Sequence, residues 1–137
     1  MEEMREKLAR LLKNAYSPYY KFPVAAIVVM SDGNEFCGVN VENANGTSIC
    51  AERNAIANAV AHGYKKGDFK ALYIMLASGK IGTPCFACRQ VIQEFMEMDR
   101  PVFCVDKNGN QRGYLVHELC PYPFSEDDLQ WKVVLLA

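Results

Sequence analysis

The sequence lacks both a strong net charge and any long apolar run. It holds 15 lysine and arginine residues against 16 aspartate and glutamate residues, a net charge of −1, and the basic residues form no block. A groove that follows a phosphate backbone needs clustered positive charge, so the composition argues against a nucleic-acid partner. A membrane-spanning helix needs about 18 or more consecutive apolar residues, and since the chain has no such stretch we expect no membrane partner.

An N-terminal secretory signal is also missing, and histidine is scarce. The first residues, from Met1 to Arg5, are charged and amphipathic, and only 2 histidines occur beside 6 cysteines. The absence of a signal predicts a cytoplasmic protein. In that compartment cysteines are thiols or metal ligands rather than disulfides. With 137 residues, 50% of them hydrophobic, the chain 1–137 is expected to form a single domain with its own core.

The hydrophobic pattern switches repeatedly between helical and strand periodicity. Helices are predicted over 2–15, 49–61 and 85–98, and strands over 24–30, 35–41, 69–77, 101–105 and 113–117. Ser125 and the acidic residues after it predict a short final helix. Helices interleaved with strands in this way are typical of a three-layer α/β/α fold.

Two short cysteine motifs carry the chemistry of the chain. The first is Cys-Ala-Glu-Arg at 50–53, and the second is Pro-Cys-Phe-Ala-Cys at 84–88. The thiolates of Cys50, Cys85 and Cys88 can hold one zinc ion and leave its fourth position open for water. Glu52 can then lie beside that water without binding the metal. The pattern is that of zinc-dependent nucleobase deaminases and supports hydrolysis at a polarised carbon.

The predicted helices favour ionised cysteines at this site. Cys50 and Cys85 lie near the starts of two helices, where the partial positive charge of the helix stabilises a thiolate. Cys85 and Cys88 are three residues apart on one helix face, so both can reach one ion. Three thiolates give the zinc and its ligands a formal charge of about −1. Arg53 can offset this charge by donating hydrogen bonds to the sulfur atoms.

A structural zinc site is the alternative interpretation of these cysteines. Structural sites are closed by four ligands, and the remaining candidates for a fourth are Cys37, Cys104, Cys120, His62 and His117. Such a site would leave Glu52 without a role. Cys37 and Cys104 fall inside predicted strands and are interpreted as small core residues, whereas Cys120 stays open. His62 is expected to cap a helix end or face solvent, and His117 to be structural.

The chain resembles the small cytidine deaminases of nucleoside salvage from Tyr16 to Leu129. The resemblance rests on Tyr-Ser-Pro-Tyr at 16–19 with Lys-Phe-Pro-Val at 21–24, on Gly-Val-Asn-Val-Glu-Asn-Ala at 38–44, on both cysteine motifs, and on Pro121, Phe124 and Asp128-Leu129. The chain departs from the family pattern at Ala25, in a shorter segment 45–49, and at Phe86, Cys120 and Ser125-Glu126.

The resemblance implies a five-stranded mixed sheet, one zinc ion per chain and Glu52 as the catalytic residue. It gives Arg53 the hydrogen bonds to the ligand sulfurs. It also gives roles to Asn40 and Glu42, whose side chains point to the same face of a predicted strand. From the residues alone, this pair would be interpreted as an ordinary solvated strand edge. In the family pattern this amide and this carboxylate hold the hydroxyls of the sugar.

The resemblance further implies aromatic contacts to the base and an assembly. Phe22 and Phe124 are expected to contact the pyrimidine. Phe124 is expected to reach the pocket of a neighbouring subunit, as is Tyr19, within a homotetramer that shares its active sites. Backbone groups near Ala51 and Pro84 are expected to orient the base.

The implied activity is the zinc-dependent hydrolysis of cytidine and deoxycytidine to uridine and deoxyuridine in pyrimidine salvage. Glu52 would take a proton from water, hydroxide would attack carbon 4 of the base, and Glu52 would pass protons to nitrogen 3 and the departing amine. Three alternatives stay open. The paired Asn40 and Glu42 argue against a different aminopyrimidine substrate, the low charge argues against nucleic-acid editing, and Glu52 argues against a non-catalytic zinc module.

Overall fold

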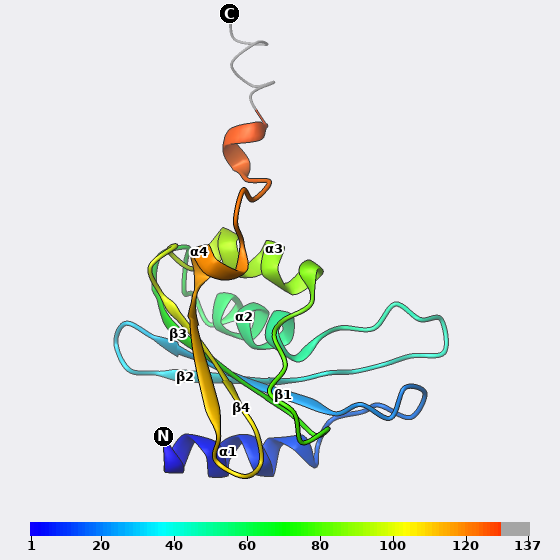
Figure 1. The fold of residues 1–137 in the computed structure, drawn as a ribbon. Helices are drawn as coiled ribbons and strands as arrows, with labels where there is room; N and C mark the ends of the chain where they lie inside the picture. Colours follow the sequence, from blue (N-terminus) through cyan, green and yellow to red (C-terminus); the bar gives the residue numbers. More distant parts are fainter. Residues whose placement is uncertain (130–137) are drawn as a thin grey trace, which may run out of the picture.

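The computed structural model describes residues 1–129 and consists of three layers (Figure 1). Helix α1 (Glu2–Leu12) covers one face of a five-stranded sheet, and helices α2 (Ala51–Ala61) and α3 (Phe86–Phe95) cover the other face. Two short helices follow the last strand, α4 (Val116–Leu119) and the 3-10 helix η1 (Glu126–Asp128). The predicted α/β/α architecture is therefore confirmed. That the whole chain 1–137 is one domain stays a prediction, because residues 130–137 lie outside the described part.

The sheet is mixed, as expected. Its strands are β1 (Val24–Met30), β2 (Glu35–Val39), β3 (Phe69–Leu76), β4 (Pro101–Val105) and β5 (Gln111–Leu115), in the spatial order β2-β1-β3-β4-β5. Only β3 and β4 are parallel, with α3 as the crossover between them, and the other neighbours are antiparallel. This arrangement brings the start of α3 close to the start of α2.

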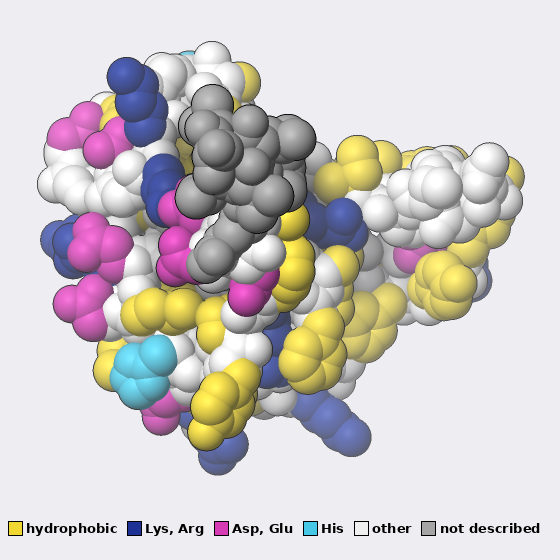
Figure 2. Space-filling model, turned by 90° about the horizontal axis from the view of Figure 1, so that it is seen from above, with side chains coloured by type: hydrophobic (Ala, Val, Ile, Leu, Met, Phe, Trp, Pro, Cys, Tyr) yellow, Lys and Arg dark blue, Asp and Glu magenta, His cyan; other side chains and the backbone are white. Residues whose placement is uncertain are grey.

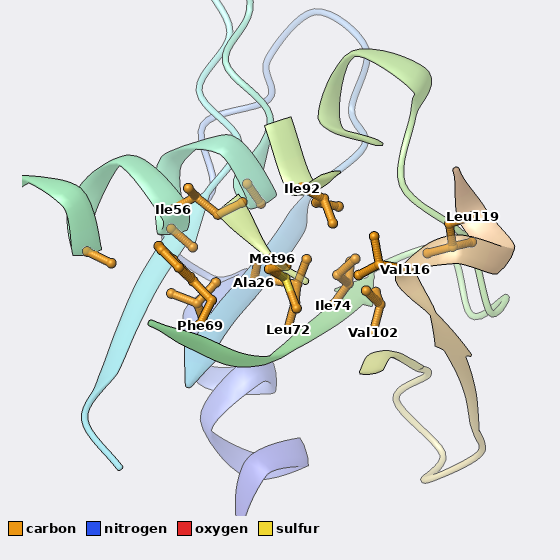
Figure 3. Close-up of a cluster of buried hydrophobic side chains, with 14 of the residues drawn as sticks. Ala26, Ile56, Phe69, Leu72, Ile74, Ile92, Met96, Val102, Val116 and Leu119 are labelled. Atoms are coloured by element: carbon orange, nitrogen blue, oxygen red, sulfur yellow. The ribbon is translucent and has the colours of Figure 1, made fainter. Parts of the chain in front are cut away.

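The composition of β1 explains why the sheet is covered on both faces. Ala26 and Val28 belong to the core beneath α2 and α3, whereas Ala25 and Ile27 belong to the core beneath α1. Successive side chains of a strand point to opposite faces, so a continuous apolar run buries both. Figure 3 shows the larger core, where side chains from the sheet meet those of the helices above it.

Gly38 allows α2 to lie directly on the edge strand β2. A Cβ atom at this position would lie 2.4 Å from the carbonyl oxygen of Ala51 and 2.4 Å from the amide nitrogen of Ala55. No side chain fits there without moving the helix. The first turn of α2 carries Glu52, so this close backbone contact determines where the predicted catalytic carboxylate lies.

Several predicted boundaries were wrong by a few residues, and the reasons are local. Cys50 and Cys85 have extended backbone conformations and precede α2 and α3 instead of belonging to them. Strand β2 ends at Val39 because the side chain of Asn40 accepts the hydrogen bond of the Val24 amide at 2.8 Å. Beyond it, Val41 forms only isolated bridges.

The remaining differences lie at α1 and around the last strand. Helix α1 ends at Leu12, not at residue 15. Strand β5 covers Gln111–Leu115, earlier than predicted, and α4 was missed because its apolar residues fit a strand pattern. The Glu118 carboxylate accepts the Leu115 amide at 2.8 Å and so starts this helix.

After α4 the chain leaves the body as a C-terminal arm, residues 121–129 (Figure 1). The predicted short helix is present as η1, where the Asp128 carboxylate accepts the Ser125 amide at 2.9 Å. The side chain of Tyr122 is fully exposed, and that of Phe124 is 58% exposed. The amide of Gln90 donates to the Phe124 carbonyl at 2.7 Å and ties the arm to α3. No helix within residues 1–129 is both long and apolar enough to cross a membrane.

Candidate active site

The three predicted ligand cysteines meet at the adjacent starts of α2 and α3. Cys50 precedes the first residue of α2, Cys85 precedes that of α3, and Cys88 lies in the first turn of α3. Their Sγ atoms all lie within 4.8 Å of one another, and those of Cys50 and Cys85 are 3.7 Å apart. Sulfur atoms gathered this closely, outside a disulfide, are arranged to share one metal ion.

None of the candidate fourth ligands joins this cluster in the part of the chain that the structure describes. Cys104 is fully buried in the core, as interpreted from the sequence, and burial raises its pKa to about 11. The core interpretation of Cys37 was wrong, because β2 is an edge strand that leaves this residue exposed. Cys120 is buried and its thiol donates to the Arg89 carbonyl at 3.5 Å. The closed four-ligand site is thus not formed by these residues.

The two histidines also lie away from the cluster. His62 ends α2, with its Nδ1 atom 2.8 Å from the Asn58 carbonyl, which matches the predicted capping role. His117 is exposed in α4. Within residues 1–129, neither histidine has a ring nitrogen close enough to the three cysteine sulfurs to share a metal ion with them.

Arg53 supplies the positive charge that the cluster needs. Its Nη2 atom donates to the Cys50 sulfur at 3.3 Å, and it also bonds Cys88; these two contacts raise the pKa of Arg53. Burial and the nearby Glu52 carboxylate raise the pKa of the Cys88 thiol. Burial also works against ionisation of Cys85, but hydrogen bonds from the Cys88 amide and from the neighbouring thiols lower its pKa.

These features fit zinc. Three sulfur donors converge on one point, a guanidinium lies beside them, and the buried Cys88 thiol loses its proton readily only when a cation binds next to it. The donor set has the softness that zinc prefers and leaves one coordination position free.

Glu52 is buried beside the cysteines instead of lying on the helix surface. It occupies the first turn of α2 and is 5% exposed. Burial raises the pKa of its carboxyl group. A carboxyl group with a raised pKa can both accept and return a proton near neutral pH.

A cavity of about 530 Å³ opens next to the cysteines and Glu52. Its walls are formed by Tyr20, Phe22, Val24, Asn40, Glu42, Ser48, Ile49, Cys50, Glu52, Leu76, Thr83 and Cys85. The volume is within the range of pockets that hold small molecules. The structure thus brings together in one cavity the predicted residues Phe22, Asn40 and Glu42 with Glu52 and two of the cysteines.

Two predicted substrate contacts are not in the cavity wall. The side chain of Ala51 is buried in the core, so only its backbone is placed to meet a ligand. Phe124 lies on the C-terminal arm, beside a second hollow that also includes Phe86 and Cys120. Within its own subunit Phe124 does not line the cavity of Glu52.

Asn40 and Glu42 already hold the loop above the cavity. The Asn40 side chain donates to the Phe22 carbonyl at 2.8 Å and accepts from the Val24 amide at 2.8 Å. Glu42, which is 5% exposed, accepts from Ser17 and from two backbone amides. Burial opposes its ionisation, but these hydrogen bonds lower its pKa.

Arg89 is a residue whose role the sequence analysis missed. Its Nε donates to the Pro84 carbonyl at 2.8 Å, Nη1 to the Leu119 carbonyl at 2.9 Å and Nη2 to the Thr83 hydroxyl at 2.9 Å. Its guanidinium lies 4.6 Å from the ring centre of Phe86. A positively charged side chain in the first turn of a helix is disfavoured by the helix dipole. This unfavourable position was the signal in the sequence that Arg89 forms hydrogen bonds to nearby acceptors.

The comparisons with known proteins decide the family. A model described as the cytidine and deoxycytidylate deaminase zinc-binding region matches residues 1–105. The chain belongs to this deaminase family.

Other members of the deaminase family match nearly the whole chain. A cytidine deaminase of Sporosarcina psychrophila is 37% identical over 132 residues, which is 96% of each protein. A probable cytidine deaminase of Dictyostelium discoideum is 40% identical over 84% of this chain and 77% of the relative. The crystal structure of cytidine deaminase from Burkholderia pseudomallei superimposes with a TM-score of 0.85 at 35% identity, covering 90% of this chain and 98% of that one.

Proposed function

We propose that this protein is a zinc-dependent cytidine deaminase, which replaces the amino group of cytidine by a carbonyl oxygen from water. One observation carries the proposal: Cys50, Cys85 and the buried Glu52 line the same cavity as Asn40 and Glu42, and Cys88 completes the cysteine cluster beside it. One cavity thus combines a metal-binding cluster and a buried carboxylate with polar groups that can bind a sugar, as a nucleoside requires.

The residues of the chain divide the work of this hydrolysis. Cys50, Cys85 and Cys88 would hold zinc, which as a Lewis acid lowers the pKa of water. With zinc bound, the Glu52 carboxylate would accept a proton from the attacking water, whose oxygen adds to carbon 4 of the pyrimidine, and would pass that proton to nitrogen 3. It would then carry the proton of the new hydroxyl group on carbon 4 to the amino group, which leaves as ammonia while the carbonyl forms. Its burial keeps bulk water away and supports this proton transfer.

Asn40 and Glu42 support the assignment of a sugar to this cavity. Both side chains keep unused hydrogen-bonding capacity toward the cavity after their bonds to the protein are counted. The exposed ring of Phe22 offers a stacking surface for the base. We infer that deoxycytidine is also a substrate.

The charge of the cavity favours a nucleoside over its monophosphate. The family description also includes deoxycytidylate deaminases, which act on a nucleotide. Glu42 and Glu52 are the charged carboxylates of the wall, and within residues 1–129 no lysine or arginine lines it. A phosphate group would therefore meet negative charge without a compensating cation.

We further infer a homotetramer with shared active sites, working in pyrimidine salvage in the cytoplasm. The C-terminal arm leaves the body, and the ring of Phe124 on it is exposed and outside its own subunit's cavity. Figure 2 shows hydrophobic side chains on the lobe that projects beside the body, and exposed aromatic residues such as Tyr19 and Tyr20 lie in the loop before β1. Exposed apolar surface of this kind is typical of subunit contacts.

The test is turnover of cytidine by the zinc-loaded protein, followed by the loss of cytidine absorbance. Deoxycytidine should also react, whereas deoxycytidine monophosphate and free cytosine should be poor substrates. A chelator should abolish turnover and added zinc should restore it. Tightly bound zinc without turnover of any of these compounds would support the structural zinc site instead.

A further inference from the structure

Ser17 forms two hydrogen bonds that organise the part of the cavity wall around Phe22 and Glu42. Its hydroxyl donates to the Oε2 atom of Glu42 at 2.5 Å. The hydroxyl oxygen of Ser17 in turn accepts a hydrogen bond from the amide of Phe22 at 2.8 Å. One hydroxyl group thus links the carboxylate proposed to bind the sugar to the aromatic residue proposed to stack on the base.

The hydrogen-bonding capacity of Glu42 is almost used up. Each carboxylate oxygen accepts about two hydrogen bonds. Oε1 accepts the amides of Tyr19 at 2.9 Å and Tyr20 at 3.1 Å, which fills it. Oε2 accepts Ser17 and keeps one position. Glu42 can therefore accept one hydroxyl group of a ligand, and Ser17 determines in which direction that position points.

The turn that carries Ser17 is held in an unfavourable backbone conformation. Lys21 has φ of 53°, in the left-handed region, where a lysine is disfavoured. Its amide donates to the Ser17 carbonyl at 3.0 Å and its Nζ atom to the Pro18 carbonyl at 3.0 Å. Such a conformation persists only where surrounding contacts fix it, and the bonds from residues 17–20 to Glu42 supply them.

We propose that Ser17 is a positioning residue for sugar recognition: by fixing Oε2 of Glu42 it sets the one free acceptor of that carboxylate toward the hydroxyl of the nucleoside. The proposal rests on the proposed function, in which Glu42 binds the sugar. Ser17 itself does not line the cavity and so acts through Glu42. Its bond to the Phe22 amide matters less, because that amide is exposed and water can replace the serine.

The experiment is a double-mutant cycle on kcat/KM for cytidine in the zinc-loaded protein, using Ser17→Ala, Glu42→Ala and both together. Ser17→Ala should lower kcat/KM about tenfold, mainly through a higher KM, because a hydrogen bond to a charged group is lost. In the Glu42→Ala background the same change should cost less than twofold. Ser17→Thr, which keeps the hydroxyl, should restore most of the activity.

A matched control is Ser31→Ala. Its hydroxyl also bonds the protein, at 3.1 Å from the Asp68 carbonyl, but outside the cavity wall, so kcat/KM should stay at the wild-type value. If Glu42→Ala does not fold, Glu42→Gln takes its place in the cycle. A glutamine whose amide nitrogen faces Ser17 cannot accept the proton of the serine hydroxyl.

The outcomes separate the two levels of the argument. Equal losses from Ser17→Ala in both backgrounds would show that Ser17 acts independently of Glu42 and would overturn the positioning role. So would wild-type activity in Ser17→Ala beside a large loss in Glu42→Ala. Wild-type activity in Glu42→Ala would instead remove the sugar contact from the proposed function, and the role of Ser17 with it.

Discussion

Replacing Arg89 by alanine should weaken both the fold and the metal site. The side chain joins the loop before Cys85 to the end of α4 through three hydrogen bonds, two of them to the backbone carbonyls of Pro84 and Leu119. A hydrogen bond from a charged donor contributes about 1.5 kcal/mol at the lower end of its usual range. The bond to Thr83 is exposed and counts for little. The two carbonyl bonds together therefore give a loss of about 3 kcal/mol in the free energy of unfolding.

Urea unfolding at a fixed chain concentration, with zinc present, measures this loss. With a slope of about 2 kcal/mol per molar urea, the midpoint of Arg89→Ala should fall by roughly 1.5 M. Because Pro84 directly precedes Cys85, zinc affinity measured by chelator competition should also fall about tenfold. Arg89→Lys, which can reach fewer of these acceptors, should be intermediate.

Arg112→Ala is the matched control, since this arginine is exposed and its one side-chain hydrogen bond within residues 1–129 is a long one, 3.4 Å to the Tyr114 hydroxyl. Arg112→Ala should leave the urea midpoint close to the wild-type value, because substitutions of exposed residues usually change stability little. If Arg89→Ala matched Arg112→Ala in both the urea midpoint and zinc affinity, the reasoning about the loop would be refuted.

Three further predictions address the catalytic carboxylate, the fold beneath it and the shared site. Glu52→Gln should keep its zinc but lose cytidine turnover by about a hundred- to ten-thousand-fold, and near-normal turnover would contradict its role in proton transfer. Gly38→Ala should displace α2, because its Cβ would lie 2.4 Å from two backbone atoms, and a loss of thermal stability with reduced zinc content checks this; wild-type values would contradict it. Mixing inactive Glu52→Gln subunits with Phe124→Ala subunits should give more activity than either parent, whereas no recovery in verified mixed oligomers would refute a site completed by the neighbouring arm.

Local signals in the sequence were sufficient to predict the layers and the three cysteines, whereas the five-stranded mixed sheet was implied by the family resemblance. The apolar run of β1 has the length of a buried strand, and the spacing of Cys85 and Cys88 places both on one helix face. The place of Glu52 beside the cysteines was also predicted from the Cys-Ala-Glu-Arg motif, and the structure buries it there.

What the sequence could not reveal depends on contacts between distant residues. Ser17 and Glu42 are 25 positions apart, and nothing local to either indicates that they bond. Cys37 has the pattern of a buried strand residue, but the strand order puts it on an edge, and strand order does not follow from periodicity. The end of β2 depends on the Asn40 side chain, whose bond to the Val24 amide replaces a ladder partner.

The origin of the three cysteines in two different parts of the sheet has a consequence for folding. Cys50 follows the β1–β2 hairpin, whereas Cys85 and Cys88 belong to the parallel β3–α3–β4 unit. Neither part alone holds three sulfur ligands, so the full metal affinity arises only after the two have docked. A metal ion bound here acts as a reversible cross-link between them, and its binding free energy adds to the cohesion of the whole sheet. The ion that supports hydrolysis would therefore bind with full affinity only to a chain in which these two parts of the sheet are docked.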